Sequence, residues 1–112
     1  MTLFTKMLNK EIPAQILFED EKCFAIRDIN PQAPVHILLI PKKEIAAMTD
    51  VTTSDQNLLG HLMLKAPEIA KSQGLSERGY RLVINTGADA GQSVAHIHIH
   101  ILGGRTFGWP AG

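Results

Sequence analysis

Three histidines alternate with isoleucines near the end of the chain. His96, His98 and His100 are each followed by isoleucine. Successive side chains of a β-strand leave it on opposite faces, so this alternation predicts a strand over residues 96–101. The isoleucines would face a core and the imidazoles would line the other face, about 7 Å apart. Imidazole serves as base, acid or nucleophile near neutral pH, so the row indicates a chemical site.

Three interpretations of the row compete. A polar, solvated face of a sheet would accept Thr, Lys or Glu equally well and does not require three histidines. A zinc site is the second, because His-x-His on a strand presents two ligands. The third is a histidine nucleophile with neighbouring histidines that orient it and move protons. No carboxylate stands in the motif as a further ligand, and a metal would occupy the lone pairs that a nucleophile needs, so we expect neither metal nor cofactor.

Length and composition restrict the class of protein. The 112 residues carry 11 basic and 11 acidic side chains, so no charge excess suggests nucleic acid or an anionic membrane as partner. Cys23 is the only cysteine, which excludes a disulfide framework and fits a reducing compartment. Residues 1–10 are too short and too charged for a signal peptide or a membrane span. We expect a cytoplasmic protein with a single domain over 1–112, of which 105–112 form a C-terminal tail.

The elements needed to position the histidines follow from periodicity. Apolar spacing predicts a short helix that ends before Ile12 and a helical turn over 44–49. A capping box of Thr53 with Gln56 would open a long helix that Gly74 terminates. Alternating or apolar runs predict strands over 14–19, 23–28, 35–40, 80–85 and 96–101. The fold class is therefore α+β: about five antiparallel strands, one long helix and a short N-terminal helix. The open sheet favours a dimer across which the sheet continues.

Two further features lie outside the histidine row. His36 is the one polar side chain in the apolar run 35–40; alone it would be a core histidine, but beside the row it suggests a supporting role. The turn-rich loop over 86–91 is of a kind that aims backbone N–H groups at an anion. Asn85, Gln92 and Ser93 flank this loop as short polar groups able to hold phosphate oxygens.

The run His-Ile-His-Ile-His-Ile-Leu resembles the pattern of the histidine triad (HIT) superfamily. The resemblance to its Hint branch extends from Phe4 to Gly112. It includes Gln92-Ser93-Val94 before the triad, Gly103-Gly104-Arg105 after it, and Trp109-Pro110 near the terminus. The chain departs from that branch at Ala95, Pro67 and Gly108.

The resemblance implies a purine nucleoside phosphoramidase and a homodimer. His98 would attack the α-phosphorus and form a nucleotidyl-histidine, which water resolves. His100 would protonate the leaving amine, and His96 and His36 would support the proton relay, with Ser93 as a further catalytic group. The expected substrate contacts, besides His98, His100 and Ser93, are Asp28 at the ribose, Asn85, Gly91 and Gln92 at the phosphate or leaving group, Leu3, Phe4, Ile26, Ile29 and Leu38 at the base, and Trp109 in a tail that reaches toward the partner.

Two other functions remain open from the sequence. One is hydrolysis of dinucleoside polyphosphates, as in the Fhit type, although that branch tends to have threonine at the position of Ser93. The other is a purine-nucleotide-binding module in which hydrolysis is incidental. Turnover of a phosphoramidate against that of a diadenosine polyphosphate separates them.

Overall fold

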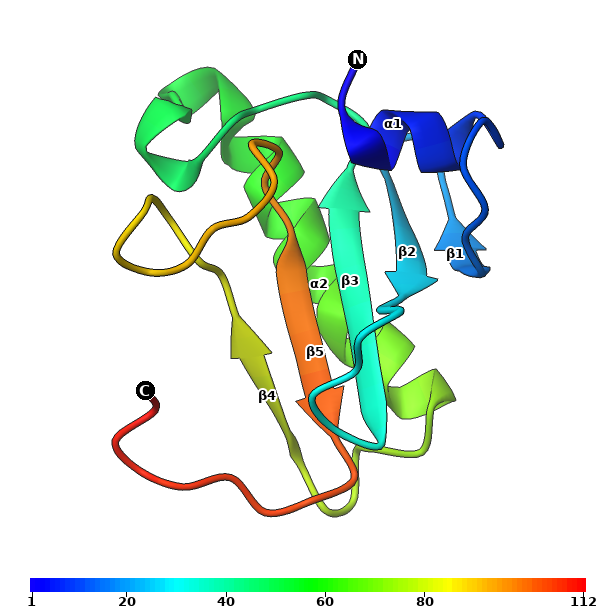
Figure 1. Ribbon diagram of the computed structural model, residues 1–112, viewed down its shortest axis with the longest axis vertical. Helices are drawn as coiled ribbons and strands as arrows, with labels where there is room; N and C mark the ends of the chain where they lie inside the picture. Colours follow the sequence, from blue (N-terminus) through cyan, green and yellow to red (C-terminus); the bar gives the residue numbers. More distant parts are fainter.

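A five-stranded antiparallel sheet forms the centre of the molecule, in the order β1-β2-β3-β5-β4 (Figure 1). The structure is a computed structural model that describes residues 1–112. The strands are β1 (Ile16–Glu19), β2 (Cys23–Arg27), β3 (Val35–Pro41), β4 (Tyr80–Val83) and β5 (Ile99–Gly103). The order places β3 and β5, which carry His36 and His100, side by side in the interior of the sheet.

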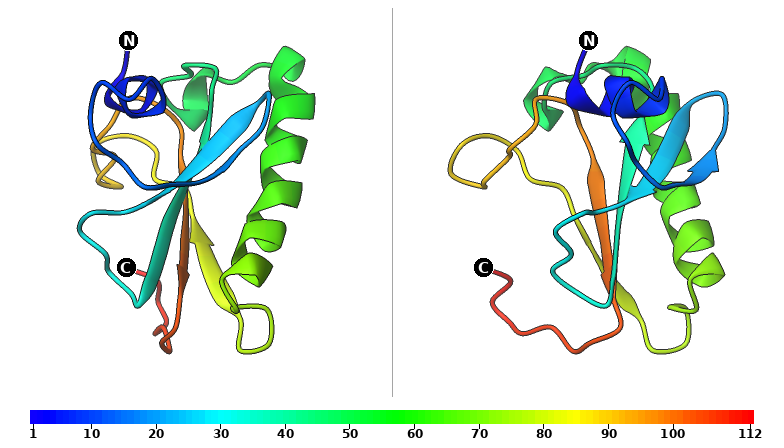
Figure 2. Two further views of the ribbon diagram at one scale, coloured as in Figure 1. Left: turned by 90° about the vertical axis from the view of Figure 1, so that its right-hand side faces the viewer. Right: turned by 45° about the vertical axis from the view of Figure 1, so that its right-hand side comes forward.

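Two α-helices cover opposite faces of this sheet (Figure 2). The long helix α2 (Gln56–Ser72) packs on one face, and the short helix α1 (Leu3–Leu8) lies over the other together with the loops between strands. The expected α+β fold, with one long and one short helix on an antiparallel sheet, is confirmed. Neither helix combines the length and the apolar character that crossing a bilayer would require.

The period of two along the strands divides the buried side chains into two cores. The core beneath α2 includes the alternate residues Cys23, Ala25, Ile37, Leu39, Ile99 and Ile101. The core beneath α1 includes the residues between them and the helix's own side chains, namely Phe4, Met7, Phe24, Ile26, Leu38 and Ile40. The isoleucines of the histidine row therefore face α2, and the imidazoles face the side of α1.

The strand expected over 96–101 is shorter than its alternation indicates. β5 begins only at Ile99, which pairs with Leu39 of β3, and His96 and His98 lie in the irregular segment before it. Side chains replace the ladder there: the His96 ring bonds to the Pro41 carbonyl and the His98 ring bonds to the His96 carbonyl. The two imidazoles thus bond backbone carbonyl oxygens just beyond the point where the pairing of β3 with β5 ends.

Three other local predictions need correction. The expected capping box of Thr53 with Gln56 is wrong, because the reciprocal pair lies one residue earlier, where the Thr52 N–H donates to Asp55. The expected helical turn over 44–49 is displaced to a 3₁₀ turn at Met48–Asp50. The short helix ends at Leu8, before Ile12 as expected, whereas the strand boundaries differ from those expected by up to three residues. Gly74 follows the end of α2 with φ +76°, as its predicted capping role requires.

Candidate active site

A pocket of about 250 Å³ opens between α1, the ends of β2 and β3, and the histidine segment. Apolar side chains form one part of its wall and polar groups converge on the other, an arrangement typical of small-molecule sites. Its lining residues are Leu3, Phe4, Met7, Ala14, Ile26, Arg27, Asp28, Ile29, Asn30, Leu38, Ser93, Val94, His98 and His100.

His98 presents one ring nitrogen to this pocket. Its Nδ1 lies 2.8 Å from the carbonyl oxygen of His96. A carbonyl only accepts, so Nδ1 carries the proton and Nε2 of the neutral ring holds a free lone pair. The ring edge packs against Phe4, with centroids 5.0 Å apart, and the side chain is only 5% exposed. His98 Nε2 is thus fixed as a nucleophile or base.

His100 presents a donor beside that lone pair. Its Nδ1 lies 2.8 Å from Nε2 of His36, while the backbone N–H of Gln32 donates to Nδ1 of His36 over 3.0 Å. Because the N–H of Gln32 can only donate, neutral His36 carries its proton on Nε2 and passes a hydrogen bond to His100. Neutral His100 therefore carries its proton on Nε2. This nitrogen is the only buried side-chain N or O atom of the chain without a hydrogen-bond partner.

Burial favours the neutral form of the His100 and His36 rings. It lowers the pKa of His100 to about 4, with His98 and His36 adding to the effect and Asp28 opposing it. Burial also lowers the pKa of His36, against the opposing charge of Asp28, whose Oδ2 lies 3.4 Å from His36 Nε2. Asp28 is therefore the group that favours an added proton on either ring.

His96 is fully buried and does not line the pocket. Its Nε2 donates to the Pro41 carbonyl over 2.7 Å, and its Nδ1 accepts from the Thr2 hydroxyl over 2.6 Å. Burial lowers its pKa. With both nitrogens engaged, His96 holds the backbone whose carbonyl orients His98. A solvated polar face is excluded as an explanation of the row.

The fold brings together most of the residues that the sequence proposed for the site. Those that line the pocket are Leu3, Phe4, Ile26, Asp28, Ile29, Leu38, Ser93, His98 and His100. His36 lies directly behind His100.

Four proposed substrate contacts lie outside the pocket: Asn85, Gly91, Gln92 and Trp109. The Gln92 side chain has a structural role, because it accepts from the Gly87 N–H and donates to the Ala46 and Val94 carbonyls. It thereby fixes the loop that carries Ser93. Trp109 is 86% exposed and touches no part of the pocket.

Sequence reasoning missed several contributors. Met7 lies one helical turn after Leu3 and Phe4, so the spacing of α1 was a usable signal. The residues Ala14, Arg27, Asn30 and Val94 complete the wall. Gln32 acts on His36 through its backbone N–H, a group that every residue except proline has. No residue type could have revealed that contact.

Three side chains of the site lie close enough together to be considered as metal ligands. Ligand atoms of Asp28, His36 and His100 lie within 4.8 Å of one another. The nearest two, His36 Nε2 and His100 Nδ1, share a proton in the hydrogen bond described above. An ion would have to displace that proton, so the set fits a proton relay better than a metal centre.

Comparison with known proteins identifies the family of the chain. An uncharacterised HIT-like protein of Synechocystis sp. is 55% identical over 111 residues, covering 99% of this chain and 96% of that protein. The crystal structure of a HIT family hydrolase from Legionella pneumophila matches with a TM-score of 0.96 and 51% identity, covering 100% of both chains. A histidine triad nucleotide-binding protein from Candida albicans matches with a TM-score of 0.83 and 30% identity, covering 100% of this chain and 85% of that one. The model of the HIT domain family matches residues 9–107, and the chain belongs to this family and has the fold of HIT family hydrolases.

Proposed function

We propose that the protein hydrolyses the P–N bond of purine nucleoside 5′-monophosphoramidates and releases a nucleoside monophosphate and an amine. The pairing of His98 and His100 carries this proposal. One ring offers a free Nε2 lone pair and its neighbour offers an Nε2 donor, both rings line one pocket, and their centroids lie 5.0 Å apart. The likeness to a HIT family hydrolase and to a histidine triad nucleotide-binding protein supports a nucleotide substrate.

The apolar and polar halves of the pocket match the two halves of such a substrate. Leu3, Phe4, Ile26 and Leu38 offer an apolar slot for a purine base. Asp28 lines the same pocket and offers its carboxylate to the ribose hydroxyls, and the Asn30 N–H, which donates to its Oδ1, holds the side chain in place. Ser93 lines the same pocket as the histidines and donates its hydroxyl to a phosphoryl oxygen.

The first step forms a covalent intermediate. His98 Nε2 gives its lone pair to phosphorus, the P–N bond to the amine breaks, and the amine nitrogen takes the Nε2 proton of His100. His100 must enter this step as imidazolium, with a proton on Nδ1 as well as on Nε2. His36 Nε2 must then accept from His100 Nδ1, so the proton that His36 holds on Nε2 in the neutral pair has to leave this position when the substrate binds. An anionic phosphoryl group beside it raises its pKa, as Asp28 already does. Protonation is required because an amine anion is a poor leaving group.

The second step regenerates the enzyme. After proton transfer, His100 Nε2 holds a lone pair and accepts a proton from water. The water oxygen bonds to phosphorus, and the P–Nε2 bond to His98 breaks with its electrons returning to the ring. One residue thus acts first as acid and then as base on the same face of the pocket.

We also propose that two copies form the functional unit. β4 is an edge strand of the sheet, and two exposed apolar side chains lie together near its end: Met63 is 51% exposed and Ile84 37%. Met63 and Ile84 also line a small pocket whose seven lining residues are all hydrophobic. Pairing of two β4 edges would continue the sheet and bury this surface.

The test mixes the purified protein with an adenosine 5′-phosphoramidate of a fluorescent amine in the presence of a chelator. We expect turnover by the parent and a loss of at least about 1,000-fold in His98→Ala. His61→Ala is the matched control, because His61 bonds Asp20 on the α2 side of the sheet and should leave turnover unchanged. Turnover confined to diadenosine polyphosphates, or equal turnover by parent and His98→Ala, would contradict the proposal.

A further inference from the structure

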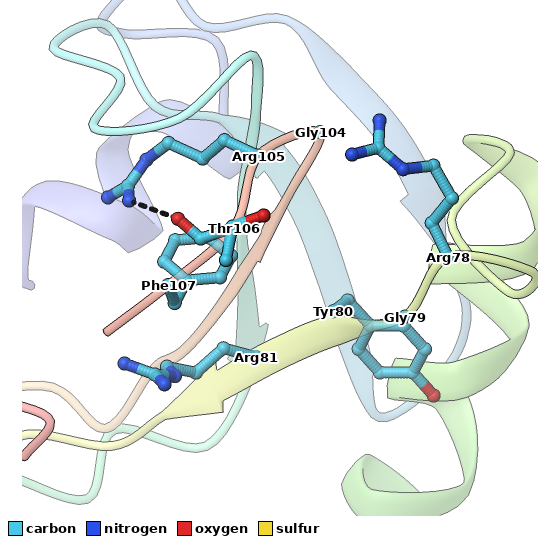
Figure 3. A pocket seen from close by; sticks show the side chains of 8 residues that line it. All are labelled: Arg78, Gly79, Tyr80, Arg81, Gly104, Arg105, Thr106 and Phe107. Atoms are coloured by element: carbon cyan, nitrogen blue, oxygen red, sulfur yellow. Dashed lines mark hydrogen bonds between the residues drawn. The ribbon is translucent and has the colours of Figure 1, made fainter. Parts of the chain in front are cut away.

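Two arginines stack on Phe107 and hold the tail after β5 against the sheet. Figure 3 shows Phe107 between the side chains of Arg105 and Arg81. The guanidinium carbon of Arg105 lies 4.2 Å from the ring centroid of Phe107, and that of Arg81 lies 5.1 Å from it. Arg81 also donates to the Gly108 carbonyl over 2.9 Å, and Arg105 donates to the Thr106 carbonyl over 3.1 Å. The direction of the Arg105 side chain is therefore fixed.

Arg105 reaches from this stack to the loop between β2 and β3. Its Nε donates to the carbonyl oxygen of Gln32 over 3.1 Å. Gly104, with φ +90°, turns the chain so closely past Pro34 that an added Cβ would lie 2.8 Å from the proline ring. The tail and the loop are thus packed together where the hydrogen bond forms.

The same Gln32 backbone determines the proton positions in the active site. Its N–H donates to His36 Nδ1, and His36 Nε2 in turn contacts His100 Nδ1. The chain of contacts runs from Arg105 through both polar groups of Gln32 to the nitrogen that faces the leaving amine. If the Gln32 N–H turned away, the proton of His36 could move from Nε2 to Nδ1. His36 Nε2 would then accept from His100 Nδ1, and neutral His100 would no longer carry a proton on Nε2.

We propose that Arg105 is a positioning residue for the proton relay, acting through the Gln32 backbone and never touching the substrate. The expected fall in kcat rests on the proposed function, whereas the expected change of the histidine tautomers does not. The proposal predicts that the tail after β5 controls the proton-transfer step, although the nucleoside pocket is formed by α1, β2 and β3.

A matched control lies in the same part of the surface. Arg78 also lines the pocket of Figure 3, but it bonds to no other residue and does not stack on Phe107. Arg78→Ala removes the same charge and the same side chain as Arg105→Ala. It leaves the stack on Phe107 and the contact with Gln32 intact.

The experiment measures imidazole tautomers and turnover together. Protein labelled with ¹⁵N in histidine reports by NMR which nitrogen of His36 and His100 carries the proton. We expect the parent and Arg78→Ala to hold both protons on Nε2. In Arg105→Ala a second tautomer or an averaged signal should appear at His36, kcat should fall about tenfold or more, and KM should stay within about twofold.

A second variant guards against misfolding of the first. Phe107→Leu keeps Arg105 but removes its aromatic platform, and we expect the same changes at a smaller size. Parental tautomers and parental kcat in both folded variants, or equal losses in Arg78→Ala, would overturn the inference. If the parent fails to cleave phosphoramidates, the tautomer measurement still tests the role of Arg105, so failure of the proposed function is recognised separately.

Discussion

At the scale of single residues, backbone groups decide what each histidine does. The His96 carbonyl leaves His98 with a free Nε2, and the Gln32 N–H leaves His100 with an Nε2 proton. Chemically identical side chains thereby take opposite roles in one pocket. A substitution that keeps the imidazoles but shifts either backbone group should disturb the chemistry.

The buried neutral rings also predict how stability depends on pH. The pKa of His100 is about 4 in the folded chain, and those of His36 and His96 are lowered too, whereas an unfolded histidine titrates near 6.5. Between these values the unfolded chain binds more protons, so stability is present above about pH 6.5 and is lost as the pH falls. Urea unfolding at pH 7.5 and 5.5 should show a loss of about 1 kcal/mol for His100 alone.

His100→Asn is the control for that measurement. The free energy of unfolding should fall less between the two pH values in this variant, because one of the rings that resist protonation is gone. Buried carboxylates do not confuse the comparison, since their ordinary pKa values lie below this window. Identical pH dependence in parent and variant would show that His100 is not held neutral by the fold.

At the scale of elements, the turn after β5 joins the sheet to the loop that supports His36. Gly104→Ala should destabilise the protein by about 2–4 kcal/mol, because φ +90° disfavours a side chain and the new Cβ would meet the rigid Pro34 ring. Gly74→Ala is the matched control: φ is +76° but nothing lies within 4 Å of its Cβ, so we expect a loss of about 1 kcal/mol. Equal midpoints in chemical denaturation for the two variants would contradict this account.

Periodicity could predict the elements because it reports on burial. The alternation at Ile97, Ile99 and Ile101 correctly indicated the face toward α2, where all three are at most 2% exposed. It could not show that the strand starts at Ile99, because two histidine rings take backbone carbonyls ahead of that point. Strand ends depend on such side-chain competition, to which apolar spacing is blind.

The candidate site was predictable where residue type carries the chemistry. His98, His100, Ser93 and Asp28 have side chains that few other residues replace, and they converge on one pocket. Gln92 was expected at the phosphate or leaving group; in the structure it lies outside the pocket and its amide bonds backbone groups of Gly87 and Ala46, a use that residue type alone could not reveal. The contribution of Gln32 is made by its backbone and required the structure.

At the scale of the whole molecule, the exposed apolar surface beside β4 predicts association. Met63→Glu should convert a dimer into a monomer in light scattering after gel filtration, because a charge at a half-exposed apolar position opposes its burial. Asn57→Glu adds the same charge to an exposed position of α2 near its start and should leave the dimer intact. A monomeric parent at micromolar concentration would contradict the proposed assembly.

The central claim is that His98 bonds covalently to phosphorus. Trapping this intermediate by denaturing the protein without acid tests the claim most directly. The protein is mixed with an adenosine 5′-phosphoramidate, denatured at alkaline pH within milliseconds to seconds, digested and analysed by mass spectrometry. The account predicts one adenylyl group on the peptide that contains the histidine row, located on His98, in the parent and not in His98→Ala. Steady turnover with no adduct at any quench time, or an adduct located on another histidine, would contradict it.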